Sequence, residues 1–381
     1  MKILQFDSIK DVPANLWVPL SKGRSLAFSR EFWETIENSK LNDFNYQHIV
    51  LVDDNEQPLL ITSFYTITTD IAIFAPKGLR ALLTAIRRFF PGFLKWRILE
   101  CGTPITVSSP PFLTSENTEL SVALRELHAH LHKSARQRAC LIIVIRDFEA
   151  NASRELSLLK KLGYESVPLL PNTYLEIHWR SIAEYHESLK SYYRSKLKKH
   201  LKRNLACGVH HRRISSFDEL AGDLCRQWLV VHHQADEFQR EVLTPAFYES
   251  FSNQLGECSQ AILFFKNDVL IGHALLLLDG QLLRWLYFGR NIAQNDSLYL
   301  YVVNSVIEAA IELGAKKLEM GVTTYSVKQD VGAQPSPINL ALRAASPLLA
   351  PFVAWGYRLM NKPPLLQKKN VFKSGPSGKD A

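Results

Sequence analysis

The sequence lacks the long apolar run that a membrane-spanning helix needs. The uncharged stretch between Arg343 and Arg358 is shorter than the ~20 residues required for a span, and it carries two prolines. The N-terminus reaches Asp7 before any apolar segment can form a secretory signal. We therefore expect a cytoplasmic chain without a transmembrane helix, for which peripheral contact with the inner face of a membrane stays open.

Cysteine is scarce and never occurs in pairs with the spacing of metal ligands, so the thiols are expected to be reduced and intracellular. The five cysteines are Cys101, Cys140, Cys207, Cys225 and Cys258. His128 and His132 share a helical face at a four-residue spacing, but no acidic base stands between them as a metallopeptidase helix would require. We assign no metal.

Several catalytic signatures are also missing. The chain has no GxSxG elbow, no phosphate loop ending in GK[ST], no HExxH and no GxGxxG fingerprint. Each of these motifs places a nucleophile, a phosphate cradle or a metal in a fixed local geometry. Hydrolase, ATPase, zinc-protease and dehydrogenase functions therefore have no support.

What is present is an ordinary globular composition with a basic excess. The 381 residues are too many for one core and fit two domains. With 46% hydrophobic residues, 22% charged residues and a net charge of +8, the chain suits a polyanionic partner. Candidates are tRNA, the phosphates of a coenzyme, a nucleotide-linked sugar or an anionic membrane.

The region from residue 282 to residue 322 predicts a strand, a polar turn, a helix and a second strand. Leu282 to Phe288 is rich in aromatic and branched residues, and a helical face follows from Leu298 to Leu313. Gly314 ends that helix, and Lys317 to Val322 forms the second strand. In such a right-handed crossover the N–H groups at the start of the helix have no partner within the helix and can donate hydrogen bonds to a bound anion.

A similar order of elements occurs earlier in the chain and predicts two tandem domains. A helix with apolar positions from Leu120 to Leu131 leads into the strand 140–145, a helix at 156–162 and an extended segment to Ile177. We predict an N-terminal domain at 1–178, a C-terminal domain at 179–345, and an apolar segment with a basic tail at 346–381. The tail either binds anionic lipid or docks on its own protein.

A basic helix is expected just after the predicted boundary. From Lys190 to Arg213 the chain has nine Lys or Arg and no acid. Like charges four residues apart repel, so an unrelieved ladder favours anion binding over a merely basic surface. Its members Arg194, Lys198 and Lys202 are candidate ligands for phosphate. In the following loop, Asp236 and Glu241 are either ligands for an acceptor ammonium or ordinary exposed acids.

The segment Tyr325-Ser-Val-Lys328-Gln-Asp-Val-Gly332-Ala333, after a strand that reaches Gly321, resembles the C-terminal catalytic domain of the Fem-like branch of the GNAT acyltransferases. The basic segment YYRSKLKKHLKRN is similar to the helix that opens the second domain in these transferases. The resemblance implies a mixed α+β fold of two tandem GNAT-like domains. Each domain would be a twisted mixed sheet flanked by helices.

The resemblance also implies transfer of an activated acyl or aminoacyl group from a thioester or a tRNA to a small-molecule or glycan-linked amine. The turn at 290–296 lacks the paired glycines with which ordinary GNAT enzymes wrap coenzyme A, and the helical arm of some Fem-type transferases has no counterpart. Acyl-CoA, an acyl carrier protein and aminoacyl-tRNA therefore all remain open as donors.

For this chemistry we expect Lys328 to stay charged and to stabilise the oxyanion or a donor phosphate. Tyr325 would act as a general acid, and Glu319 is a weaker candidate for the base. Tyr325 could instead pack at the domain interface while Lys328 is a surface charge. The competing function is non-catalytic binding of an anionic glycan, lipid or RNA. The expected donor ligands beside the basic helix are Arg290, Gln294, Asn295 and Ser297.

Overall fold

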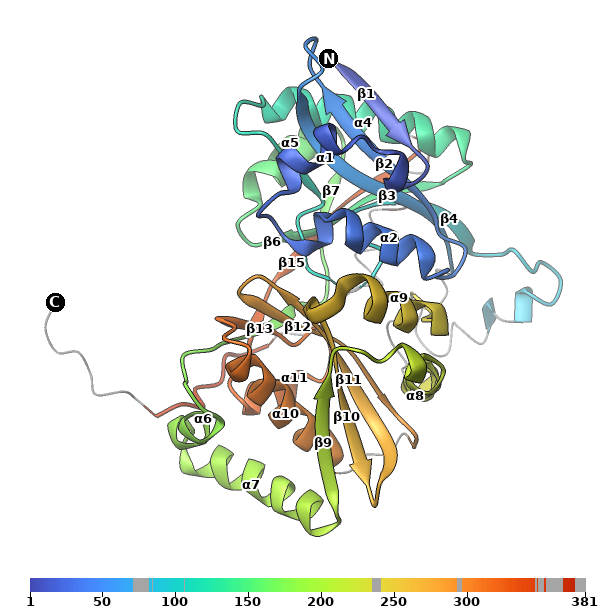
Figure 1. Cartoon of the computed structure of the whole chain (residues 1–381). Helices are drawn as coiled ribbons and strands as arrows, with labels where there is room; N and C mark the ends of the chain where they lie inside the picture. The colour runs from blue at the N-terminus through green and yellow to red at the C-terminus, as the bar shows by residue number, and fades with distance from the viewer. Residues whose placement is uncertain are drawn as a thin grey trace, which may run out of the picture. The chain divides into compact units, whose positions relative to one another are not determined.

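The computed structural model describes residues 1–70, 82–83, 85–105, 107–234, 241–292, 297–346, 348, 353 and 366–373. The chain divides into two compact units (Figure 1). Each unit is assembled from three stretches of chain, so no single cut in the sequence separates them. Unit 1 comprises Met1–Leu170, Asp236–Val242 and Pro337–Pro364, and unit 2 comprises Pro171–Ala235, Leu243–Ser336 and Leu365–Ala381.

The described residues of unit 1 form one mixed sheet of eight strands. Its order is β1-β2-β3-β4-β6-β15-β7, and β5 pairs with β3. Strands β4 and β6 are parallel, and the other pairs are antiparallel. The strands are β1 (Lys2–Phe6), β2 (Asn45–Val52), β3 (Pro58–Asp70), β4 (Lys95–Cys101), β5 (Phe112–Thr114), β6 (Ile142–Glu149), β7 (Glu165–Pro168) and β15 (Ile338–Ala344).

Helices cover both faces of this sheet, and each helix packs on it through one apolar stripe. Helix α4 (Leu120–Gln137) joins the parallel strands β4 and β6, and its Leu124, Leu127 and Leu131 are buried in the same cluster as Leu99 and Ile143 of the sheet. On the other face the rings of Trp17 and Trp33 contact His48 of β2. The helices are α1 (Ala14–Ser21), α2 (Arg30–Asn38), α5 (Ser153–Lys161) and the 3₁₀ turns η1 (Ile9–Asp11) and η2 (Leu26–Phe28).

Unit 2 has a second mixed sheet, of seven strands among the described residues. Its order is β14-β8-β13-β12-β11-β10-β9, in which β12 and β13 are parallel and are joined by α10 (Leu298–Glu312). The predicted strand, helix and strand at 282–322 are therefore present. The strands are β8 (Asn172–Glu176), β9 (Val209–Ile214), β10 (Ser259–Lys266), β11 (Val269–Asp279), β12 (Leu282–Arg290), β13 (Lys317–Glu319) and β14 (Gln334–Ser336).

The two faces of this sheet also carry helices. On one face, α10 and α7 share an apolar cluster with Ile262 and Leu276 of the sheet. On the other, α8 lies so close to β12 that a side chain at Gly289 would overlap His273 and the backbone of Trp228, so only glycine fits. The helices are α6 (Ile182–Ser188), α7 (Ser191–Ala206), α8 (Ala221–Gln234), α9 (Pro245–Leu255), α11 (Tyr325–Asp330), η4 (Asp218–Leu220) and η5 (Gly256–Cys258).

The two sheets exchange strands. In the first sheet β15, from the C-terminal part of the chain, lies between β6 and β7. In the second sheet β8, which directly follows β7, lies between β13 and β14. The predicted domain ranges 1–178 and 179–345 instead place β8 in the N-terminal domain and β15 in the C-terminal domain. An extended apolar segment shows that a strand forms, but it does not show which sheet the strand joins.

The described part of the C-terminal segment docks on unit 2. The Lys190 N–H donates to the Val371 carbonyl at 2.9 Å, and the Lys373 N–H donates to the Ser188 carbonyl at 2.8 Å. Most of the apolar stretch 346–360, the expected membrane contact, lies outside the described residues. In the part of the chain that the structure describes, every helix is too short or too polar to cross a bilayer.

Candidate active site

The short strand β13 pairs with only the beginning of its longer parallel neighbour β12. Leu282 to Arg284 of β12 pair with Lys317 to Glu319 of β13, where β13 ends while β12 continues to Arg290. Along this continuation the ring of Tyr299 from α10 lies 5.7 Å from Trp285 and 5.7 Å from Phe288. The end of β13, the second half of β12 and the first turn of α10 therefore surround one corner of the sheet.

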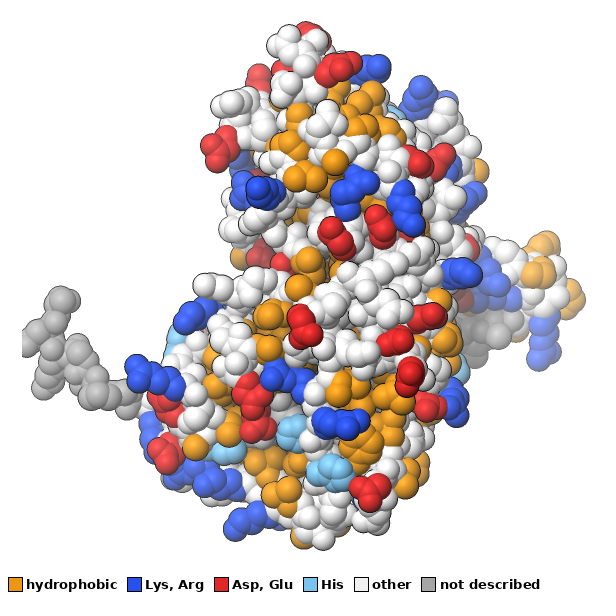
Figure 2. Space-filling model, in the orientation of Figure 1, with side chains coloured by type: hydrophobic (Ala, Val, Ile, Leu, Met, Phe, Trp, Pro, Cys, Tyr) orange, Lys and Arg blue, Asp and Glu red, His pale blue; other side chains and the backbone are white. Residues whose placement is uncertain are grey.

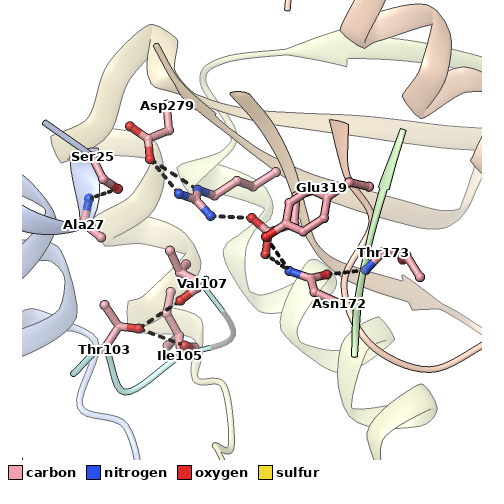
Figure 3. A network of polar contacts seen from close by, with 11 residues as sticks. Ser25, Ala27, Thr103, Ile105, Val107, Asn172, Thr173, Asp279 and Glu319 are labelled. Atoms are coloured by element: carbon pink, nitrogen blue, oxygen red, sulfur yellow. Dashed lines mark hydrogen bonds and ion pairs between the residues drawn. The ribbon is translucent and has the colours of Figure 1, made fainter. Parts of the chain in front are cut away.

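A buried network of charges crosses the sheet at this corner (Figure 3). The guanidinium of Arg284, which is 3% exposed, donates to Asp279 at 2.8 Å and to Glu319. The Asn172 amide donates to the other oxygen of Glu319 at 2.6 Å, and the Thr173 N–H donates to Asn172 at 2.8 Å. Because these partners engage both of its oxygens, Glu319 is badly placed for the role of base that the sequence suggested.

The chain leaves β13 through a strained turn. Gly321, Thr323 and Thr324 all have positive φ, at 72°, 74° and 49°. This region is unfavourable for threonine, whose side chain branches at Cβ, and such strain persists only where surrounding contacts enforce it. One such contact is the Thr173 hydroxyl, which donates to the Gly321 carbonyl at 2.7 Å. The turn brings the chain directly into α11.

Lys328 points back from α11 into this turn. Its ammonium donates to the carbonyls of Gly321 and Val322, both at 3.1 Å, and the side chain is only 3% exposed. Burial lowers the pKa of Lys328 to about 7, against the opposing attraction of Glu319. Lys328 is therefore neither a surface charge nor a permanently charged group, because near pH 7 a substantial fraction of it is neutral.

Tyr325 begins the same helix. Its hydroxyl donates to the Pro171 carbonyl at 2.9 Å, and its ring is half-buried within unit 2. Tyr325 and Lys328 are three residues apart on α11 and therefore project from one side of it. In the described conformation the Tyr325 proton is held by a backbone carbonyl, so release to a leaving group requires that bond to open.

The basic ladder of α7 follows the predicted helix. Lys198 and Lys202 are exposed, and Figure 2 shows Lys and Arg side chains gathered at the lower left, where α7 lies in Figure 1. Arg194 is half-buried and donates to the Glu187 carbonyl at 3.5 Å. The Asn204 amide donates to the Ser297 carbonyl at 3.0 Å, which holds the end of α7 beside the start of α10.

Of the other residues predicted to bind the donor or the acceptor, some are buried and some lie outside the described residues. Arg290 and Ser297, at the two ends of the turn between β12 and α10, are 7% and 8% exposed. Gln294 and Asn295 lie outside the described residues, as does Asp236.

Glu241 is not an exposed loop acid but a 7% exposed residue of unit 1. Burial raises the pKa of Glu100, and the negative charge of Glu241 raises it further, while the positive charge of Arg146 lowers it. The predicted acceptor ligand Glu241 thus belongs to unit 1, whereas the predicted catalytic residues Lys328 and Tyr325 belong to unit 2.

Sequence reasoning missed Arg284, Asp279 and Asn172. The one available signal was an arginine inside the apolar strand segment LLRWLYF, because a buried guanidinium requires buried acids. Asn172 carried no such signal, since asparagine before a strand is ordinarily a turn residue.

The histidines of α4 serve local contacts. His128 lies 3.2 Å from the Tyr164 hydroxyl, and His132 lies 3.1 Å from the Ala345 carbonyl. Across the residues that the structure describes, no three His, Cys, Asp or Glu side chains are grouped as a metal site.

Comparisons with known proteins identify the fold. No family model matches the chain. A protein of Mycobacterium tuberculosis that carries the name 8-amino-7-oxononanoate synthase 2 is 29% identical over 321 residues, which cover 82% of this chain and 41% of that protein. The chain thus spans about two fifths of the length of this relative.

Two solved structures are similar over most of their length. A tandem GNAT protein from the clavulanic acid biosynthesis pathway has a TM-score of 0.55 at 10% identity, covering 91% of this chain and 99% of that one. FemX has a TM-score of 0.54 at 13% identity, covering 89% of this chain and 97% of that one. Together with the two mixed sheets flanked by helices, these likenesses show that the chain has a tandem GNAT fold of the Fem-like kind.

Proposed function

We propose that the chain is an N-acyltransferase whose reaction centre lies in unit 2, where β13 ends and α11 begins. It would move an activated acyl or aminoacyl group from a thioester or a tRNA ester to an amine. The observation that carries this proposal is the burial of Lys328 against a strained turn, since burying an ionisable group costs stability and groups with strongly shifted pKa values concentrate at functional sites.

The pKa of Lys328 suits proton transfer from an amine. An acceptor ammonium of ordinary pKa must first lose a proton, after which its nitrogen attacks the acyl carbonyl. The C–N bond forms, the C–S bond of the thioester or the C–O bond of the tRNA ester breaks, and the thiol or hydroxyl leaves. Neutral Lys328, with its pKa of about 7, would take the second amine proton and return it to the leaving group.

The neighbouring groups have supporting roles in this scheme. When protonated, Lys328 also favours the negative charge that develops on the acyl oxygen. The Tyr325 hydroxyl would exchange its bond with the Pro171 carbonyl for one to the leaving group. Glu319, held by Arg284 and Asn172, would set the electrostatic environment of Lys328 and take no proton itself.

The donor phosphates would bind between α7 and the start of α10. The contact from Asn204 to Ser297 holds α7, which carries the exposed cations Lys198 and Lys202, beside the N-terminus of α10, where the helix dipole favours negative charge. Coenzyme A, the phosphopantetheine of a carrier protein and the 3′ end of tRNA all present phosphates within reach of such a corner. We therefore propose an acyl-CoA as the first donor to test and aminoacyl-tRNA as the second.

The acceptor is proposed to be a small-molecule or glycan-linked primary amine. The Mycobacterium tuberculosis relative is named for the synthesis of 8-amino-7-oxononanoate, which is itself a primary amine. An amine panel for the test should therefore contain amino acids with a long aliphatic chain as well as amino sugars.

The test measures amide formation by mass spectrometry, with acetyl-, octanoyl- and palmitoyl-CoA and charged tRNA offered to that panel. We expect at least one pair to react with the parent protein, and Lys328→Met to reduce kcat/KM by about 100-fold or more. Lys317→Met, which replaces a half-buried lysine on β13, is the matched control and should change the rate less than threefold. Equal rates in the parent and in Lys328→Met would refute the assignment.

A second candidate function is non-catalytic binding of an anionic glycan, lipid or RNA. The exposed cations of α7 favour it, because binding alone requires them and does not require Lys328. A binder would retain its affinity for an RNA or an anionic vesicle in Lys328→Met, lose it on substitution of the α7 cations, and form no amide with any donor.

A further inference from the structure

The C-terminal segment 366–373 is built into unit 2. Val371 is fully buried in the apolar cluster of α10 and α7, and Phe372 forms an antiparallel bridge with Leu189. The ring of Phe372 lies 5.2 Å from that of Trp179. A side chain added at Gly332, whose φ is +100°, would come within 2.2 Å of the Phe372 ring. The segment therefore packs directly on the chain that leaves α11.

The same segment is bonded to α11 itself. The ammonium of Lys369 lies 2.7 Å from Asp330, the last residue of α11. The buried amide of Gln329 donates to the Gln367 carbonyl at 2.6 Å, and the amide of Gln334 donates to the Lys369 carbonyl at 3.2 Å. These three bonds attach both the helix and the strand that follows it to one short stretch of chain.

Asp330 joins this segment to the basic helix. Its second oxygen accepts a hydrogen bond from Lys196 of α7 at 2.7 Å, so one carboxylate is shared by two lysines from distant parts of the sequence. The Asp330 side chain is 11% exposed, whereas the two lysines are 39% and 33% exposed. A carboxylate with two charge-assisted partners is held more firmly than one in a single surface pair.

Helix α11 needs such support because it is short. It has six residues, far fewer than an isolated helix needs for stability in water, and it follows a turn with two threonines at positive φ. Its conformation must therefore come from tertiary contacts. The contacts described above account for its C-terminal end, while Lys328 and the Gly321 carbonyl account for its start.

We propose that segment 366–373 is a strap that holds α11 in the conformation needed for acyl transfer, with Asp330 and Lys369 as positioning residues. The inference rests on the proposed function for its catalytic consequence, but the order of α11 can be measured without any reaction. Breaking the bond between Asp330 and Lys369 would leave Val371 packed in the cluster of α7 and α10, while Lys328 would lose its fixed place in the turn.

The experiment compares Asp330→Asn and Lys369→Gln with the matched control Lys368→Gln, which replaces the exposed neighbouring lysine. Hydrogen exchange is followed by mass spectrometry at the amides of Lys328, Val331 and Ala333, which close α11 and its end. We expect exchange at these amides to be at least tenfold faster in the two strap variants and unchanged in the control. Exchange in α10 should stay the same in all three proteins. A deletion of 366–381 should show the larger effect if it folds, and the point variants decide the question if it does not.

Kinetics then separate positioning from general damage. In the two strap variants kcat should fall at least fivefold with KM for the acyl-CoA nearly constant, because the proposed donor cations Lys198 and Lys202 are not substituted. Unchanged exchange in α11, or faster exchange with an unchanged kcat, would overturn the strap. Absence of transfer in every protein, including the parent, refutes the proposed function, and the exchange rates in α11 then decide by themselves whether the strap exists.

Discussion

In each unit a helix follows the second of the two parallel strands, α5 after β6 and α11 after β13, and the two helices bury different kinds of side chain. In unit 1, α5 buries Leu159 and leaves Lys160 and Lys161 exposed, as an amphipathic surface helix does. In unit 2, α11 buries Lys328 and Gln329 in the corresponding topological place. The same connection thus buries an apolar side chain in one unit and an ionisable side chain in the other, and only the second arrangement carries a cost in stability.

The buried Arg–Glu pairs of the two sheets differ in a related way. In unit 1 the glutamate is on the first parallel strand, and Arg146 lies 3.5 Å from Glu100, which also accepts the Tyr65 hydroxyl at 2.6 Å. In unit 2 the arginine is on the first parallel strand, and Arg284 is held by both Glu319 and Asp279. The guanidinium of Arg146 therefore lies farther from its glutamate than that of Arg284 does, and Arg284 is shared between two carboxylates.

The largest effect that tests this comparison should come from removing the two arginines. Arg284→Met leaves two buried carboxylates without their cation and should cost about 3–5 kcal/mol of unfolding free energy. Arg146→Met should cost only about 1–2 kcal/mol, because Glu100 keeps its tyrosine partner. Urea unfolding of both variants measures the difference. Equal losses would mean that the two pairs are energetically alike.

The glycines that end the two helices should rank next. Gly332 and Gly163 both have positive φ, at +100° and +83°. A methyl group at Gly332 meets the packed ring of Phe372, whereas at Gly163 it meets the movable guanidinium of Arg343. We expect Gly332→Ala to cost about 2–4 kcal/mol and Gly163→Ala about 1–2 kcal/mol in thermal or urea unfolding. The reverse order would show that Phe372 yields easily.

Substituting methionine into the two helices should give changes of opposite sign. Leu159→Met should cost less than about 1.5 kcal/mol, since the volume is nearly conserved. Lys328→Met should stabilise the protein at pH 7 by about 2 kcal/mol, because it removes a buried charge. Urea unfolding of both variants at pH 7 measures the two signs.

The pH dependence provides the check on the lysine. The folded pKa of Lys328 is about 7, below its ordinary value of 10.5, so between these values the unfolded chain binds more protons than the folded one. The contribution of Lys328 to stability therefore becomes more favourable as pH rises, by at most about 1.4 kcal/mol per unit, and the advantage of Lys328→Met over the parent should shrink from pH 7 to pH 9. A constant difference over that range would contradict the lowered pKa.

The smallest effect on stability is expected on α7. Replacing Arg194, Lys198 and Lys202 together by Ala should change the unfolding free energy by no more than about 0.5 kcal/mol per site. The affinity for coenzyme A, measured by calorimetry, should nevertheless fall at least tenfold, and the loss should be smaller at high salt. Lys160→Ala with Lys161→Ala on α5 is the control and should leave the affinity unchanged. An unaltered affinity in the triple variant would remove α7 from the donor site.

Much of the fold could be read from residue patterns. The apolar spacing of α4 and α10, the aromatic run of β12 and the charge ladder of α7 each follow from local rules, and each element is present. The allocation of β8 and β15 could not be read in the same way, because strand propensity is local while pairing is decided by the whole sheet.

The residues of the candidate site could be named from the sequence, but their burial and electrostatics could not. Lys328 stood out because of the residues around it, yet nothing in that segment indicated that the ammonium would face two carbonyls in the interior. Its lowered pKa depends on burial by residues distant in sequence, and so does the closure of Glu319 by Asn172. Likewise, Lys369 had the pattern of a membrane-binding tail residue, and only the folded chain shows its bond to Asp330.

The exchange of β8 and β15 between the sheets also determines when each sheet can be completed during protein synthesis. The first sheet lacks the strand between β6 and β7 until Ile338–Ala344 has emerged from the ribosome, after every described strand of the second sheet. Until then the edges of β6 and β7 are open to pairing with other chains, which is a known route to aggregation. A gene fragment that stops at residue 178 would leave those edges open permanently, so soluble expression of unit 1 requires a fragment that contains both crossings of the chain.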